Sequence, residues 1–222
     1  YPAVVRNELG QEVATTYNYA LGVPTSVLDA NGTTTTATYD GFGRMKTITA
    51  PGDTSPTLSV TYYDTRIPFQ VDLAQTVSAS SSIRISRFYD GAGREIQSQT
   101  ANTVVEGILK NVVVDTQYNN LGQTVKKTTP YVLTGNPSPT FAAQTFSQTY
   151  TATTYDVIGR IITITAPNQT IVNYGYTDLT TTVTDPKQNQ SVTTADIWGH
   201  TKLVVPPTGP SIEYTYNVLN KL

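Results

Sequence analysis

Tyr-Asp-Gly-Phe-Gly-Arg at residues 39–44 decides the fold, because its pattern recurs along the chain. Tyr-Asp-x-x-Gly-Arg returns at residues 89–94 and 155–160. Looser copies occupy residues 7–11 (where Arg6 replaces Tyr), 118–123, 196–200 and 216–221. A motif repeated at unequal intervals predicts an array of about seven like units. The function of such an array belongs to its assembled surface and not to one pocket.

The motif positions suit a tight turn. Asp or Asn at the second position can accept hydrogen bonds from amides further along, and Gly at the fifth permits a positive φ. Tyr ends the incoming strand, and Arg can pair with Asp or stack on a Tyr of a neighbouring hairpin. We therefore expect these positions to be structural. They are Tyr39, Asp40, Gly43, Arg44, Tyr89, Asp90, Gly93, Arg94, Tyr118, Asn119, Gly122, Tyr155, Asp156, Gly159, Arg160, Asp196, Gly199, Tyr216 and Asn217.

Each motif lies between runs of alternating residues. Residues 45–49 and 161–165 follow two copies, and residues 60–62 and 212–216 are further runs rich in β-branched and aromatic residues. A period of two in such residues indicates strands, and the helix signal is poor throughout. The chain is therefore predicted to be all-β, an array of consecutive antiparallel β-hairpins with the motif at the hairpin turns.

Second turns lie between the motifs. They are predicted at residues 29–32, which contain Asn-Gly, and at residues 50–53, 166–169 and 185–190. Polar or Pro-rich surface loops are predicted at residues 78–82 and 135–139. Neither loop is long enough to be a domain linker, so residues 1–222 are interpreted as one continuous array.

The composition of the chain argues against several classes of function. Lys and Arg number 14 against 16 Asp and Glu, without a basic stripe, which argues against a nucleic-acid partner. Charged residues make up 14% of the chain, and abundant Thr supplies polar surface typical of an exported β protein. There is no Cys, so disulfides and thiolate sites are excluded. No apolar run is long enough to span a bilayer. The chain starts at Tyr1, and we interpret it as a piece of a longer protein.

The motif resembles the YD repeat of RHS proteins, which also occurs in bacterial toxin complexes and in animal teneurins. Residues 50–53, 62–64, 89–94 and 129–131 are similar to the toxin-complex branch, meaning its B and C components and SpvB-associated proteins. The resemblance implies a curved or spiralling sheet of hairpins, a segment of a hollow shell around a toxin polypeptide. About seven units are too few for a complete shell, and the region that closes such shells and cleaves itself is missing.

No enzyme constellation is found. The single His, His200, occupies the Arg slot of a degenerate motif and has no evident orienting partner, so we interpret it as structural. One His and no Cys also argue against zinc, and no cofactor motif is present. Tyrosines two apart, at residues 17 and 19, 174 and 176, and 214 and 216, could stack on sugars. Packing on neighbouring hairpins is the simpler interpretation.

The sequence therefore predicts a non-enzymatic shell segment of a secreted or cell-surface bacterial protein. The predicted partners are the rest of the same polypeptide shell and an enclosed toxin polypeptide. An adhesion module that binds a glycan or a cell-surface protein is the main alternative. A fibre-forming segment is the third, since a short array leaves strand edges that can pair with further chains.

Overall fold

The structure is a computed structural model, and it describes residues 1, 3–78, 81–105, 108–133, 140–144, 146–217, 219 and 221. The regular secondary structure of these residues is entirely β, in 19 strands. Each strand pair with a defined register is antiparallel. The predicted all-β array of antiparallel hairpins is confirmed. The predicted loop at 135–139 and the tip of the loop at 78–82 (79–80) lie outside the described residues.

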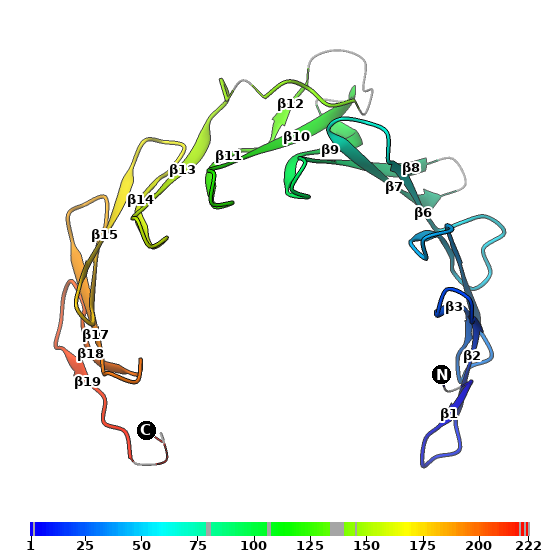
Figure 1. Ribbon diagram of the computed structural model, residues 1–222, viewed down its shortest axis with the longest axis horizontal. Helices are drawn as coiled ribbons and strands as arrows, with labels where there is room; N and C mark the ends of the chain where they lie inside the picture. Colours follow the sequence, from blue (N-terminus) through cyan, green and yellow to red (C-terminus); the bar gives the residue numbers. More distant parts are fainter. Residues whose placement is uncertain are drawn as a thin grey trace. The chain divides into compact units, whose positions relative to one another are not determined.

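The chain divides into two compact units, which we describe separately. The first unit comprises residues 1–114 and 130–143, and the second comprises residues 115–129 and 144–222. Strand β10 (Ile108–Tyr118) contributes residues to both units. Within each unit, consecutive strands lie side by side in a curved sheet (Figure 1).

In the first unit each strand pairs with the next one along the chain, and β12 returns to pair with β10. Its other strands are β1 (Val4–Arg6), β2 (Glu12–Asn18), β3 (Val23–Leu28), β4 (Thr34–Tyr39), β5 (Met45–Thr49), β6 (Leu58–Tyr63), β7 (Phe69–Ser78), β8 (Ser81–Tyr89), β9 (Glu95–Val105) and β12 (Tyr131–Val132).

The second unit starts with residues 115–118 of β10, which pair with β11, and continues strand by strand to β19. Its other strands are β11 (Thr124–Thr128), β13 (Tyr150–Tyr155), β14 (Ile161–Thr165), β15 (Ile171–Thr177), β16 (Thr180–Thr184), β17 (Gln190–Ala195), β18 (Thr201–Val205) and β19 (Ile212–Glu213).

Five motif copies form the turns of hairpins, as predicted. They join β4 to β5, β8 to β9, β10 to β11, β13 to β14 and β17 to β18. Each of these hairpins has a β-bulge next to the turn. In the first, Thr38 pairs with Thr47 but Tyr39 pairs with Met45, so Lys46 is the extra residue. The bulge recurs at the same position in the other four hairpins. Bulges bend a strand and increase its twist.

Strand parity places the motif turns at one end of each sheet, because antiparallel strands put successive turns at alternate ends. The turns at 40–44 and 90–94 share one end of the first unit. The copy predicted at residues 7–11 joins β1 to β2 and therefore lies at the opposite end. The turn that does lie at the motif end there joins β2 to β3 and contains Tyr17-Asn18 and Gly22. The sequence analysis missed this turn.

The second turns at residues 29–33, 166–170 and 185–189 have both backbone hydrogen bonds of the motif turn, whereas the turn at 50–53 does not. At residues 29–33 the amide of Gly32 donates to the carbonyl of Asp29, as the amide of Gly43 does to the carbonyl of Asp40. A two-residue hairpin turn at Asn-Gly would need a positive φ at both residues. Among residues 29–33 only Gly32 has a positive φ, of 78°. The side chain of Asp29 accepts from the amides of Asn31 and Thr33, and this stabilises the longer loop.

Polar side chains dominate the buried positions of the described residues. Four apolar residues are buried, Val60, Phe88, Ala101 and Val113. The buried polar residues are Gln70, Asp72, Ser86, Gln97, Gln99, Asn111, Asp115 and Thr128. Buried polar groups must be hydrogen-bonded to be tolerated, so this part of the sheet depends on hydrogen-bonded side chains as well as on apolar packing.

Candidate functional site

The motif Asp closes its turn with its side chain. Asp40 Oδ1 accepts from the amides of Phe42 and Arg44, each at 2.9 Å. Burial by itself would raise the pKa of Asp40. The hydrogen bonds from Arg44 and from the two amides outweigh it and hold the pKa below its usual value. The predicted positive φ is also observed, at 78° for Gly43.

Arg44 joins this turn to the next strand. Its Nε donates to Asp40 Oδ2 at 2.7 Å, and its guanidinium carbon lies 4.1 Å from the ring centroid of Tyr62 on β6. The Tyr62 hydroxyl donates to the carbonyl of Met45, directly after the arginine, at 3.1 Å. Asp64 accepts two further hydrogen bonds from Arg44, at 2.8 and 2.9 Å. We call the acid, the cation and the tyrosine of the next strand the motif clamp.

The motif clamp recurs twice in the second unit. Arg160 Nε lies 2.7 Å from Asp156 Oδ2, and the guanidinium carbon lies 4.2 Å from the ring centroid of Tyr176. His200 Nδ1 lies 2.9 Å from Asp196 Oδ2, and the imidazole stacks on Tyr216 at 4.8 Å. The hydroxyls of both tyrosines donate to the carbonyl of the residue that follows Arg160 or His200. His200 thus has the geometry of the arginine that it replaces.

The remaining motif residues have the same local placement. Tyr39, Tyr89, Tyr118 and Tyr155 each end a strand. Asp90, Asn119 and Asn217 each accept from two amides of their own turns. Arg94 Nε donates to Asp90 Oδ2 at 2.8 Å. The motif glycines Gly93, Gly122, Gly159 and Gly199 have positive φ.

Sequence reasoning missed which tyrosine the Arg or His of each clamp contacts. This tyrosine lies 16 or 18 residues after the Arg or His, because one strand and one turn separate them: Arg44 and Tyr62, Arg160 and Tyr176, His200 and Tyr216. This spacing was visible in the sequence. Tyr176 and Tyr216 belong to the pairs considered for sugar stacking, and their rings and hydroxyls are engaged within the fold.

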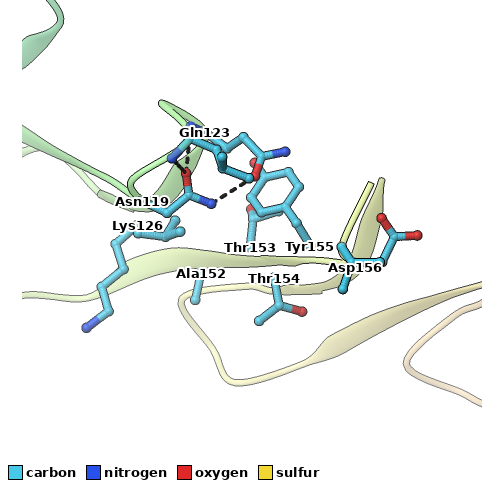
Figure 2. Close-up of a pocket in the computed structure, with 11 residues that line it drawn as sticks. Asn119, Gln123, Lys126, Ala152, Thr153, Thr154, Tyr155 and Asp156 are labelled. Atoms are coloured by element: carbon cyan, nitrogen blue, oxygen red, sulfur yellow. Dashed lines mark hydrogen bonds between the residues drawn. The ribbon is translucent and has the colours of Figure 1, made fainter. Parts of the chain in front are cut away.

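The copy at 118–123 has Gln in place of Arg, and a groove lies beside it (Figure 2). The Gln123 side chain donates to the carbonyl of Gly159 at 3.0 Å and accepts from Asn119 at 2.8 Å. The groove has a volume of about 540 Å³, with Leu121 and Val157 among its lining residues. The corresponding groove at the Arg44 copy has a volume of about 350 Å³ and is lined by Arg44 itself. The degenerate copy therefore has the roomier groove.

A short extended segment lies on the sheet of the first unit. Gln97 on β9 donates to the carbonyl of Ala142 at 2.9 Å and accepts from its amide at 3.0 Å. Gln99 donates to the carbonyl of Thr140 at 2.7 Å, and Phe141 packs on Phe88 at 5.7 Å between ring centroids. We call residues 140–142 the strap. Both glutamines are fully buried and bind the strap through its backbone.

Among the described residues, no three potential metal ligands come together. The described residues also contain no helix with the length and apolar character needed to cross a membrane.

Two family models match the chain. The model described as "RHS Repeat" matches residues 4–55, and "Domain of unknown function (DUF6443)" matches residues 63–184. The chain is an RHS-repeat protein of the DUF6443 family. None of the curated proteins matches it. Asp40 and Arg44 of the first motif clamp lie in the region matched by the RHS repeat, and the whole clamp of Asp156, Arg160 and Tyr176 lies in the region matched by DUF6443.

Solved structures of toxin-complex proteins share the fold of this RHS-repeat chain. TcdB2-TccC3 without its hypervariable C-terminal region matches 98% of the chain with a TM-score of 0.77 and 15% identity. The Photorhabdus luminescens Tc holotoxin pore with a substituted TccC3 matches all of it with a TM-score of 0.76 and 14% identity. The match covers 17% of each of those chains, so this chain spans about a sixth of their length.

Proposed function

We propose that this RHS-repeat chain is a non-enzymatic wall segment of an extracellular bacterial shell that encloses a toxin polypeptide. Residues 1–222 form one continuous stretch of that wall, and the repeat-motif residues join its hairpins. The wall continues into the rest of the same polypeptide. The toxin-complex proteins that share the fold support this proposal, as does the absence of an evident catalytic constellation from the sequence.

The strap is the observation that carries the proposal. Gln97 and Gln99 bind an extended stretch of chain through its backbone carbonyls and amide, which every polypeptide possesses. A sheet that binds backbone groups can hold unfolded cargo of many sequences, because such contacts do not depend on side chains. The low charge of the chain also suits contact with cargo of either sign.

The motif clamps suit a wall and not a catalytic site. In the clamp of Arg44, Asp40 accepts from its own turn and from the guanidinium, and Tyr62 donates to a neighbouring strand. These groups are paired within the sheet, and the same arrangement recurs in the second unit. Side chains occupied in this way stabilise a continuous surface.

Single cysteines can test enclosure, since the chain has no native Cys. Thr61 on β6 is exposed and lies on the face of the sheet that carries the strap. Thr61 pairs with Asp72, and Asp72 pairs with Ser86, so the three side chains share one face. Phe88 lies two residues after Ser86, therefore on the same face, and contacts the strap. Arg87 is exposed on the opposite face. Thr61→Cys and Arg87→Cys would be reacted with a bulky maleimide, in the full-length protein and in this chain alone.

Enclosure predicts that one of the two cysteines is protected in the full-length protein, whereas both react in the isolated chain. A photocrosslinker at the protected position should then capture peptides from outside the RHS array. Equal labelling of both faces in the full-length protein would exclude a closed shell. Protection without captured cargo would support a shell but not an enclosed toxin.

A further inference from the structure

The turns at the motif end of the second unit present a row of large apolar side chains to solvent. Val157 is 97% exposed and Trp198 78% exposed, although both are apolar. Among the described residues, the row comprises Leu121, Val157, Ile158, Leu179, Ile197, Trp198 and Leu219, each of them exposed. We call this row the apolar rim.

The apolar rim is specific to one end of the sheet. At the opposite end of the second unit, the turns at residues 166–170, 185–189 and 206–210 are fully described, and they carry none of the exposed large apolar side chains. Their tips are Pro, Asn, Gln, Lys, Thr and Gly. Turn chemistry alone does not require apolar residues, since Asn and Asp with Gly suffice. Exposed apolar patches of this kind mark interaction sites.

The rim contains both a groove and a projecting tip. The groove of about 540 Å³ lies between the turns at 119–123 and 156–160, and its lining includes Leu121, Val125, Tyr155 and Val157. The tip is Ile197-Trp198, in the turn between β17 and β18. Five strand spacings separate groove and tip along the sheet, roughly 24 Å at ~4.8 Å per strand.

We propose that the apolar rim is a two-fold interface to a second copy of this chain. In a two-fold pair the same patch faces itself, so the Ile197-Trp198 tip of each copy enters the groove of the other. The axis then passes near β15 and β16, midway between groove and tip. Leu179, in the turn between these two strands, meets the same region of the other copy there.

The available apolar area favours this occupant. With roughly 100 Å² for an exposed aliphatic side chain and about 200 Å² for Trp, the rim offers on the order of 600 Å² per copy. Two copies then reach the ~1,200 Å² at which specific interfaces begin. Asp156 is ion-paired with Arg160 within its own turn, and Asp196 Oδ2 lies 2.9 Å from His200 Nδ1.

Trp198 is the only Trp in the chain, so its fluorescence reports on the rim alone. The experiment combines sedimentation velocity and Trp emission over a hundredfold range of chain concentration. We expect a monomer at low concentration, a dimer at high concentration, and a blue shift of the emission that follows dimer formation. Trp198→Ser and Val157→Asp should each raise the dimer dissociation constant at least tenfold.

The matched control is Phe42→Ser, which removes an exposed apolar turn tip from the first unit. It should leave the dissociation constant unchanged, and at concentrations where the wild type is monomeric all variants should keep the wild-type melting temperature. A monomer with unshifted emission at every concentration would overturn the proposal. A dimer insensitive to Trp198→Ser would mean association through another surface, such as the terminal strand edges. Phosphatidylcholine vesicles serve as the competing probe, since a blue shift with vesicles but not with concentration would mean a lipid occupant instead.

Discussion

Replacing Gly43 by Ala should destabilise the array through backbone conformation alone. Gly43 has a φ of 78°, and an added Cβ would meet only the Leu21 carbonyl oxygen, at 4.0 Å. Steric overlap is therefore small. The left-handed conformation costs an L-residue about 1–2 kcal/mol. Loss of glycine freedom in the unfolded chain offsets about 0.4–1 kcal/mol of this. We expect a net loss of about 1 kcal/mol, and a larger loss for Gly43→Val because Val is β-branched.

Gly41 in the same turn is the matched control. It lacks a positive φ, and a Cβ there would meet nothing within 4 Å. Gly41→Ala should leave the free energy of unfolding unchanged or increase it slightly, since only the unfolded-state effect remains. Urea unfolding followed by far-UV circular dichroism measures both variants. Equal midpoints for Gly43→Ala and Gly41→Ala would refute the assignment of strain to the positive φ.

Three further predictions concern the clamps and the strap. Arg160→Lys should lower the free energy of unfolding, measured in urea, by about 0.5–1 kcal/mol, because Lys has no planar group to stack on Tyr176. Tyr176→Phe should lose only the hydrogen bond of the tyrosine hydroxyl. Motif carboxylates with lowered folded pKa values stabilise the fold fully above their unfolded pKa of about 3.9, and this stabilisation is lost as the pH falls through the folded values. Thermal midpoints should therefore be level from pH 5 to 7 and fall below pH 4, and a level profile down to pH 3 would contradict this. Gln97→Ala should speed hydrogen exchange at the Ala142 amide without changing exchange in β14, and an unchanged Ala142 rate would show that Gln97 does not hold the strap.

The local structure of the motif followed from its residues. Asp accepts from amides of its own turn, Gly alone adopts a positive φ at low cost, and alternating β-branched residues form strands. These effects act within six residues of chain, so the hairpin turns at 39–44 and 155–160 were predictable. For the same reason the sequence did not separate the copy at 7–11 from the motif turns, since its Asn7 side chain makes the same local hydrogen bonds.

The length of its turn explains why the copy at Asn18 was missed. The turn at Asn18 has one more residue before its glycine than the motif has, so it did not fit the pattern. Only the pairing of β2 with β3 places it at the motif end. Parity of antiparallel strands is a property of the whole sheet, and a local pattern does not contain it.

The sequence by itself determined the all-β class, the hairpin turns and the repeat family to which this chain belongs. Tertiary structure decided which end of the sheet each turn occupies, which tyrosine each arginine contacts, and that Gln97 and Gln99 bind the strap. The physical reason is the range of the interactions. Turn and strand preferences depend on neighbours in sequence, whereas clamps, strap and apolar rim join residues that only the pairing of strands brings together.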